Sequence, residues 1–225
     1  MKTVDKRRKN EIRGTDHAEY GKTIVREILQ QDGLDRDIPA FETAMRKVNG
    51  KYYLFIIDRL KKGYAYSCTP DDVCRNLAAV PPGDLMGLNL VIFYQPKTKE
   101  DIRDGSWGRV VYDYQHGSSV KPAVILEAVD ISREQRIPKT ADPSDREEIR
   151  QLTEEGHTFT DMGAYYLMKS TMEAVRRTQL DRTLFHEIGH YYDSIRGIAR
   201  NHRDKEAFAN GYAKRMQEKL KEMCD

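Results

Sequence analysis

Two histidines and a glutamate form the pattern in this sequence that most directly indicates chemistry, in the order His186-Glu187-Ile188-Gly189-His190. Residues four apart on an α-helix lie on the same face, one turn above the other, so both imidazoles can reach one divalent cation. Glu187 would then lie close to the open coordination position of that cation. The pattern therefore predicts a helix with two metal ligands, His186 and His190, and a carboxylate that can act as a general base.

The helix that carries this pentapeptide is expected to be at least half-buried, because apolar residues surround the motif: Leu184, Phe185, Ile188 and Ile195. Buried imidazoles need polar partners, so an alternative is a pair of hydrogen-bonded core histidines beside a solvent-facing Glu187. Gly189 costs about 1 kcal/mol relative to alanine inside a helix. That cost predicts that another element approaches closely at this turn.

This HExxH pentapeptide resembles that of the zincin metallopeptidases, and the resemblance extends over roughly residues 88–222. It implies an α+β, zincin-like fold, in which a mixed twisted sheet places an edge strand over the motif helix and a second, C-terminal helix supplies a ligand. It also implies a bound Zn²⁺ and hydrolysis of a peptide bond. The substrate would be an extended segment of a peptide or protein that pairs with the edge strand near residues 107–114.

A tetrahedral zinc site with an open position needs a third protein ligand. The metzincin pattern places a glycine three residues and a histidine six residues after the second ligand, but Asp193 and Arg196 stand at these positions. The sequence from Lys205 to Asn210 instead resembles the start of the ligand helix of the gluzincins. This resemblance implies that Glu206 is the third ligand.

Other residues near the motif have more than one possible role. His202 and Asp204 remain alternatives for the third ligand, and His202 is expected in the loop between the two helices. Asn210 could hydrogen-bond the ring N–H of a metal-binding histidine, or it could be an ordinary exposed residue. Asp193 could fill the same role, or it could form a surface salt bridge with Arg196.

The resemblance also implies a mechanism. Zinc would lower the pKa of a bound water to about 7 and polarise the scissile carbonyl. Glu187 would take a proton from that water and return it to the leaving amine. A donor to the developing oxyanion is expected, and the candidates are Tyr165, Tyr166, Tyr212 and His157. Two other functions stay open: a catalytically silent zincin scaffold used for binding or regulation, and hydrolysis of another amide or an ester.

Apolar runs and turn signals predict the elements that position these residues. Strands are expected at residues 52–57 and 64–67 as a β-hairpin, then at 88–94, 109–114 and 123–129, with 109–114 at the sheet edge. Helices are expected near residues 24–29, from the Thr69 cap to about 80, at 142–155, at 171–196 and from about 204 almost to the end.

Composition limits the remaining possibilities. The 225 residues include 38 Lys and Arg against 36 Asp and Glu, and this near-balance argues against a nucleic acid partner. No apolar run approaches the roughly 20 residues of a membrane span, and the N-terminus lacks the apolar stretch of a secretory signal. Because the three cysteines cannot all pair within the chain, we expect free thiols and a cytoplasmic location.

The domain organisation follows from the same features. Residues 1–14 are basic and poor in apolar groups, which predicts a flexible tail. Residues 15–225 are expected to form a single domain, with 15–87 an N-terminal extension and 88–222 the catalytic part. The sequence has no GxGxxG, Walker A or GxSxG pattern, so dinucleotide-binding, nucleotide-binding and serine-hydrolase functions have no support.

Overall fold

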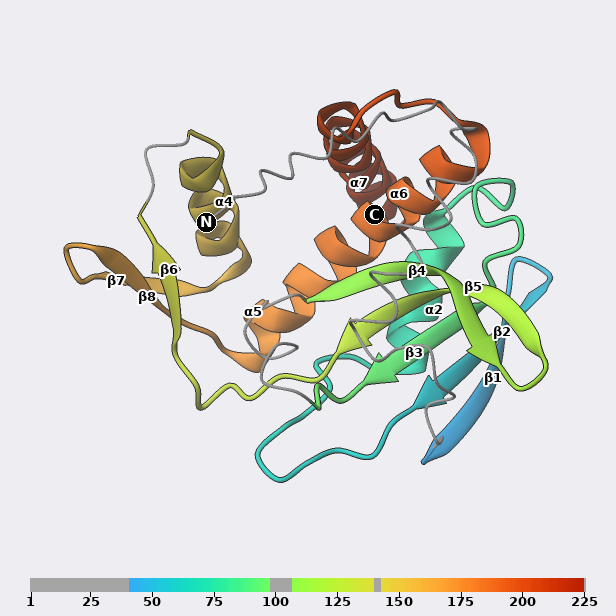
Figure 1. The fold of residues 1–225 in the computed structure, drawn as a ribbon, viewed down its shortest axis with the longest axis horizontal. Coiled ribbons are helices and arrows are strands. Elements are labelled where there is room, and N and C mark those ends of the chain that lie inside the picture. The colour runs from blue at the N-terminus through green and yellow to red at the C-terminus, as the bar shows by residue number, and fades with distance from the viewer. Residues whose placement is uncertain (1–40, 98–106, 140–142, 225) are drawn as a thin grey trace, which may run out of the picture. The chain divides into compact units, whose positions relative to one another are not determined.

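A five-stranded mixed sheet forms the centre of the computed structural model, which describes residues 41–97, 107–139 and 143–224 (Figure 1). The strand order is β1-β2-β3-β5-β4, and the strands are β1 (Glu42–Val48), β2 (Lys51–Ile57), β3 (Leu90–Tyr94), β4 (Gly108–His116) and β5 (Ser119–Glu127). β2, β3 and β5 are parallel, whereas β1 and β4 run antiparallel to their neighbours. Among the described strands β4 is therefore an edge strand, as the sequence predicted.

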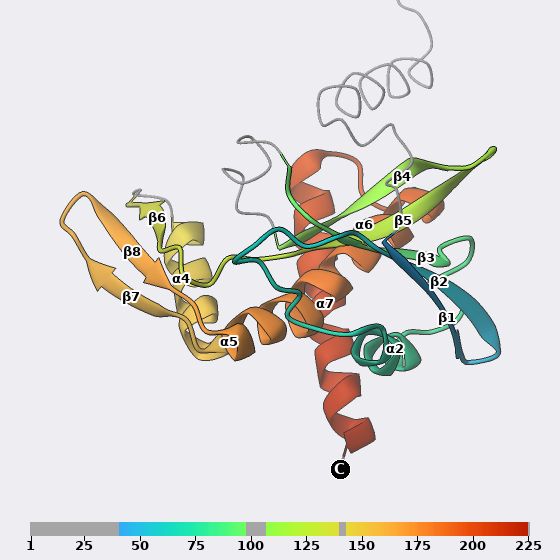
Figure 2. The ribbon, with the colours of Figure 1, turned by 90° about the horizontal axis from the view of Figure 1, so that it is seen from below.

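The core lies between one face of this sheet and several helices (Figure 2). Every residue of β3 is buried, which fits a central parallel strand with an unbroken apolar sequence. Alternate side chains of this strand, Val91 and Phe93, belong to the same core cluster as Leu184, Phe185 and Ile188 of the motif helix. Burial of these side chains holds the predicted metal-binding helix against the sheet.

The predicted hairpin between residues 52–57 and 64–67 is wrong. β2 instead pairs antiparallel with β1, across a turn in which Asn49 and Gly50 both have positive φ angles, 48° and 83°. Asn-Gly is a strong signal for a two-residue hairpin, but the strand before it, β1, is mixed in composition and mostly exposed, so it carries little apolar pattern. In the segment 64–67, Ala65 forms only an isolated bridge with Val129.

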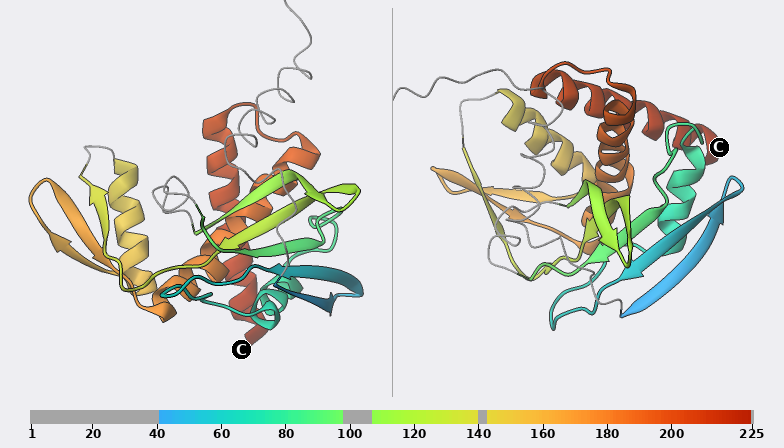
Figure 3. Two further views of the ribbon diagram at one scale, coloured as in Figure 1. Left: turned by 60° about the horizontal axis from the view of Figure 1, so that its bottom comes forward. Right: turned by 45° about the vertical axis from the view of Figure 1, so that its right-hand side comes forward.

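A second sheet, which the sequence did not predict, precedes the motif helix. Its order is β6-β8-β7, and its strands are β6 (Gln135–Pro138), β7 (Thr158–Asp161) and β8 (Tyr165–Lys169). Figure 3 shows the predicted helix α4 (Pro143–Glu155) beside this sheet. These strands have only four or five residues and are largely half-buried or exposed, so their sequences carry little apolar periodicity.

The helices agree well with the predicted ranges. α2 (Pro70–Ala79) begins at the predicted Thr69 cap, which forms a capping box with Asp72. The helix predicted at 171–196 is continuous but contains a π-helical stretch, in the order α5 (Met172–Arg177), η1 (Thr178–Thr183) and α6 (Leu184–Arg196). The last helix, α7 (His202–Cys224), begins slightly earlier than predicted.

The chain is thus an α+β protein with a mixed sheet, as expected from the sequence. The described residues all belong to one compact unit, Asp37–Asp225. The predicted tail at 1–14 and the predicted helix near 24–29 lie outside the described residues. Cys68 and Cys74 are free thiols, in line with the prediction. Within the described ranges, none of the helices has the length and apolar character that a membrane crossing requires.

Candidate metal centre

The structure brings together the three predicted metal ligands, which we call the His-His-Glu cluster: His186 and His190 from α6, and Glu206 from α7. The Nε2 atoms of the two histidines are 2.9 Å apart. Glu206 places Oε2 3.5 Å from Nε2 of His186 and Oε1 3.4 Å from Nε2 of His190. Each residue therefore offers one ligand atom, and these atoms all lie within 4.8 Å of one another.

These separations suit a small tetrahedral cation. Two ligand atoms that each lie about 2.1 Å from a tetrahedral zinc ion are about 3.4 Å from one another. Each carboxylate oxygen of Glu206 lies at about this value from one imidazole, Oε2 from His186 and Oε1 from His190. The distance between the imidazoles is about 0.5 Å shorter and would open slightly. Two imidazoles with one carboxylate are also a donor set that zinc commonly takes.

The protonation states of the cluster favour cation binding. Burial lowers the pKa of His186, and the neighbouring His190 acts in the same direction. Burial also lowers the pKa of His190. Neutral imidazoles keep a lone pair for a metal, and the carboxylate of Glu206 adds negative charge, so the cluster needs no deprotonation of its histidines near neutral pH.

Asn210 orients one of the two imidazoles. Its Oδ1 lies 2.9 Å from Nδ1 of His186 and accepts the hydrogen bond when Nδ1 carries the proton. This tautomer leaves the lone pair of Nε2 directed at the cluster, which is the usual arrangement behind a metal-binding histidine. This is one of the two roles that the sequence left open for Asn210, which lies one turn after Glu206 on the same face of α7.

The start of α7 explains which acidic residue joins the cluster. Asn201 caps the helix, since its Oδ1 accepts the N–H of Asp204, and its amide donates to the Asp204 carboxylate; both distances are 2.9 Å. Asp204 is thereby used in capping and is not part of the cluster. His202 is the first residue of α7, and its expected place in the loop was wrong because Asn201 begins the helix sooner.

Asp193 performs neither of its two predicted roles. The residue is buried, and its Oδ1 accepts the N–H of Ala199 at 2.6 Å. Gly197 ends α6 in the left-handed conformation, with φ 63°, and donates its N–H to the Asp193 carbonyl. Arg196 instead lies over the ring of Tyr192, 5.6 Å from its centroid. Asp193 therefore shapes the turn from α6 towards α7.

Glu187 faces the edge strand. Its Oε2 accepts the backbone N–H of Val110 at 2.8 Å. Burial raises the pKa of Glu187 to about 7, with a further contribution from the negative charge of Glu206. On the same strand, the Tyr112 hydroxyl donates to the carbonyl of His190 at 3.4 Å. The carboxylate predicted to be a general base thus bonds the backbone of β4, and the charge of Glu206 in the cluster acts on it.

Gln179 in the π-helical stretch fixes the motif helix to the sheet. Its Nε2 donates to the carbonyls of Trp107 and Glu127, both at 2.7 Å. One buried side chain thereby ties η1 to the chain at the start of β4 and to the end of β5. π-Helical turns often occur at functional sites, but no pattern in the sequence identified this one.

The predicted donors to an oxyanion have other partners. The ring of His157 lies between Ser170 and Thr178, at 2.8 and 2.9 Å. The hydroxyl of Tyr212 donates to Asp84 at 2.8 Å. Tyr165 and Tyr166 belong to β8. Arg136 of β6 lies over the ring of Tyr165, and Lys139, the residue after β6, lies over the ring of Tyr166. We therefore assign no role at the cluster to these four residues.

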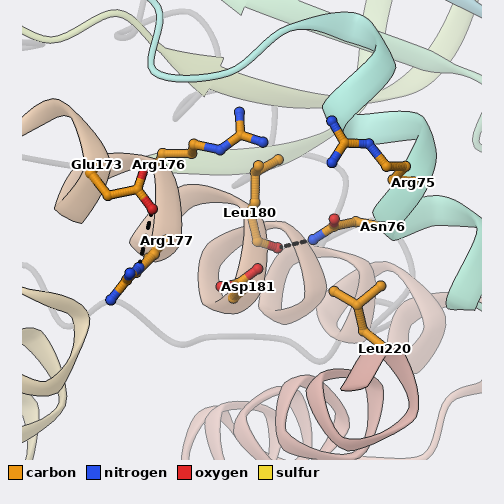
Figure 4. Close-up of a pocket in the computed structure, with 8 residues that line it drawn as sticks. All are labelled: Arg75, Asn76, Glu173, Arg176, Arg177, Leu180, Asp181 and Leu220. Carbon is orange, nitrogen blue, oxygen red and sulfur yellow. Dashed lines mark hydrogen bonds and ion pairs between the residues drawn. The ribbon is translucent and has the colours of Figure 1, made fainter. Parts of the chain in front are cut away.

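A separate hollow of about 250 Å³ lies among α2, α5, η1 and α7 (Figure 4). Its charged residues have partners nearby: Arg177 pairs with Glu173 at 3.3 Å, and Arg176 pairs with Asp72 at 2.5 Å. Asn76 donates to the carbonyl of Leu180 at 2.8 Å, as the close-up shows. None of the lining residues belongs to the His-His-Glu cluster, so the hollow is not part of the candidate metal centre.

Comparisons with protein-family models, curated proteins and solved structures found no match for this chain.

Proposed function

We propose that this protein is a zinc-dependent peptidase with a zincin-like fold. The observation that carries this proposal is the convergence of His186, His190 and Glu206 within 4.8 Å of one another. Glu187, the residue after His186, bonds the backbone of an edge strand. The sequence pattern requires only two imidazoles on one helix face. The approach of Glu206 from a different helix is independent support, because it completes a three-ligand set of the kind used by catalytic zinc sites.

Zinc would be held by the His-His-Glu cluster. When bound, it would supply Lewis acidity, which lowers the pKa of a coordinated water to about 7 and polarises a carbonyl. Asn210 would keep the His186 imidazole in the tautomer that binds the cation. Burial lowers the pKa of both imidazoles, which favours the neutral forms that can bind a cation.

The substrate would be an extended segment of a peptide or protein. β4 pairs with β5 on one side, and on the other side its Val110 N–H already reaches a carboxylate, that of Glu187. An edge strand with such outward-facing groups can bind an extended peptide through backbone hydrogen bonds. This arrangement would bring a peptide bond next to both Glu187 and the cluster.

Glu187 would act as the general base and then as a general acid. It would accept a proton from the attacking water as the water oxygen bonds to the carbonyl carbon. When the C–N bond breaks, Glu187 would return that proton to the leaving nitrogen, so water is consumed and no proton is lost. The Val110 N–H restrains the carboxylate in this position, because it bonds one of its two oxygens.

The test combines metal analysis with a cleavage screen on the purified full chain. We expect one zinc per chain and cleavage of unfolded casein or of a library of unstructured peptides. Glu187→Gln should keep the zinc, because the amide oxygen can still accept the Val110 N–H, but should lower kcat by about 10²–10⁴. Glu218→Gln, at an exposed position of α7, serves as the control. Bound zinc without turnover would favour the binding or regulatory function instead.

A further inference from the structure

The buried amide of Gln179 has partners for both its N–H groups and for its oxygen, and each partner belongs to a different part of the chain. Its Nε2 donates to the carbonyls of Trp107 and Glu127, and its Oε1 accepts the hydroxyl of Ser67. The Trp107 carbonyl also accepts the N–H of Glu127 at 3.2 Å, so both carbonyls lie where the pairing of β4 with β5 begins. The amide therefore joins η1 to this end of the edge strand.

The π-helical stretch allows Gln179 and Glu187 to reach the same strand. Residues eight apart on an α-helix point about 80° away from one another, whereas residues seven apart differ by only about 20°. In η1 the N–H of Leu184 donates to the carbonyl of Gln179, five residues back, so this turn holds one residue more than an α-helical turn. Gln179 and Glu187 are eight apart in the sequence, but the extra residue places them as residues seven apart would lie, on nearly the same face.

These two side chains bond the edge strand at positions three residues apart. Gln179 bonds the carbonyl of Trp107, immediately before β4, and Glu187 bonds the N–H of Val110. Between these positions Gly108 comes so close to η1 that a Cβ atom there would lie 3.1 Å from a threonine methyl group of that stretch. The strand is therefore held at two points along the motif helix, with close packing between them.

The other polar links of β4 do not fix it along the helix. Arg109 donates from Nη1 to Oε1 of Glu127 at 2.8 Å, but this bond, like the ladder with β5, lies within the sheet. The hydroxyl of Tyr112 reaches the carbonyl of His190 only at 3.4 Å, near the limit of a hydrogen bond. Both bonds of Gln179 are 2.7 Å long. Among the described contacts Gln179 thus supplies the firmest link that is independent of Glu187 itself.

We propose that Gln179 is a positioning residue for the peptidase. Its two bonds set the position of β4 along the motif helix, and this position brings the Val110 N–H to the carboxylate of Glu187. An extended substrate that pairs with β4 takes its own position from the strand, so the same bonds set where the scissile peptide bond lies relative to Glu187 and the cluster. The effect on catalysis rests on the proposed peptidase function, whereas the contact between Val110 and Glu187 does not.

Hydrogen exchange of the Val110 amide in the zinc-free full chain tests the position of β4 directly. Gln179→Met keeps the side-chain length but cannot bond the two carbonyls, so Val110 should exchange at least about tenfold faster relative to the amides of the central strand β3. Glu187→Ala should accelerate it equally, because it removes the acceptor. Asn76→Leu is the matched control: it removes another buried amide that bonds η1, at the carbonyl of Leu180, and should leave the relative rate at Val110 unchanged.

Kinetics of the zinc-loaded chain measure the catalytic consequence. Gln179→Met should keep one zinc per chain, because the three predicted ligands lie on α6 and α7. It should lower kcat on unfolded casein about 10- to 100-fold, since a displacement of about 1 Å can cost this much. Asn76→Leu should keep the wild-type kcat at a similar loss of thermal stability. Gln179→Asn, which keeps the amide on a shorter side chain, should show the same two changes as Gln179→Met and replaces it if the methionine variant does not fold.

The outcomes separate this proposal from the function on which it rests. Val110 exchange at the wild-type relative rate in the folded Gln179 variant would overturn the positioning role and leave the peptidase intact. Equal losses of kcat in Gln179→Met and Asn76→Leu would make Gln179 a general structural support and overturn the role as well. If the wild type binds zinc but cleaves nothing, the peptidase proposal fails, and exchange at Val110 still decides whether Gln179 positions β4.

Discussion

Gly189 of α6 and Ala209 of α7 meet so closely that a Cβ atom at position 189 would lie 3.0 Å from the Ala209 Cα and equally close to the Cβ of Tyr212. Carbon atoms rarely approach to this distance. The contact sets the separation of the two helices at the level of the His-His-Glu cluster, because α6 carries both histidines and α7 carries Glu206. It also explains why a glycine stands inside the motif helix, where the sequence indicated crowding.

Gly189→Ala should destabilise the protein. Alanine gains about 1 kcal/mol of helix propensity, but the added methyl group meets backbone atoms that can yield only if α6 and α7 separate. Overpacking of this kind costs about 1–3 kcal/mol, so urea unfolding should show a net loss of about 1 kcal/mol. Zinc affinity should fall with it, since the ligands of the two helices move apart.

Gly211→Ala is the matched control for that variant. The same Cβ construction at position 211 meets only a flexible arginine side chain, that of Arg215, at 3.7 Å. The helix-propensity gain should therefore remain, and stability should rise by up to about 1 kcal/mol. Equal stabilisation by the two alanines would contradict the proposed tight contact at Gly189.

Removal of any one ligand should abolish tight zinc binding. His186→Ala, His190→Ala and Glu206→Ala each leave two of the three donors, so zinc should dissociate at micromolar concentrations and the zinc-dependent increase in Tm should disappear. Calorimetry with added zinc and thermal unfolding with and without a chelator measure both effects. Asp204→Asn is the control: its side chain has the same length and can still accept a hydrogen bond from the capping residue Asn201, so the variant should retain zinc. Zinc binding that survives Glu206→Ala would remove Glu206 from the ligand set.

Asn210→Ala should weaken zinc binding without changing the ligand set. Loss of the acceptor for the His186 Nδ1–H frees the ring to rotate or change tautomer, which typically lowers metal affinity by 10- to 100-fold. Asn210→Asp keeps an acceptor at the same position and should retain or increase the affinity. If Asn210→Ala binds zinc as tightly as the wild type, the hydrogen bond to His186 has no part in ligand orientation.

Only part of the candidate site follows from a local rule. His186 and His190 need only the helical repeat. Glu206 was implied by the resemblance to the gluzincins, with His202 and Asp204 left as alternatives, and Asn210 lies one turn after it. β3 and the second half of β5 lie within the predicted strands 88–94 and 123–129, because buried strands of a helix-covered sheet are apolar. The first half of β5, residues 119–122, was missed because its sequence is mixed and its side chains are half-buried or exposed. The Thr69 cap of α2 was predicted from its side-chain chemistry.

The contacts that the sequence could not reveal join distant parts of the chain. The Val110 N–H that bonds Glu187 is a backbone group, so no residue type identifies it. Gln179 bonds two carbonyls that lie 72 and 52 residues away along the chain. Asn and Asp can both cap a helix, so the sequence left open whether α7 begins after Asn201 or at Asp204. The choice of Asn201 as the cap places His202 inside the helix instead of in the preceding loop.

His157 should make the stability of the fold depend on pH. The ring is 1% exposed and bonds Ser170 and Thr178, and burial, together with the nearby positive charge of Arg182, lowers its pKa to about 4. In the unfolded chain an ordinary histidine has a pKa near 6.5. Above about pH 6.5 the ring is neutral in both states, and its contribution to stability is fully present.

Between about pH 6.5 and 4 the unfolded state binds a proton that the folded state does not, so stability should fall by up to about 3 kcal/mol. His157→Gln removes the titrating ring but keeps a side chain that can hydrogen-bond both hydroxyls. Urea unfolding of zinc-free protein at several pH values should therefore give a shallower decline for the variant than for the wild type. All other ionisable groups are common to both proteins, so the difference between the two curves isolates His157. Parallel curves would mean that the buried ring accepts a proton as readily as one in the unfolded chain.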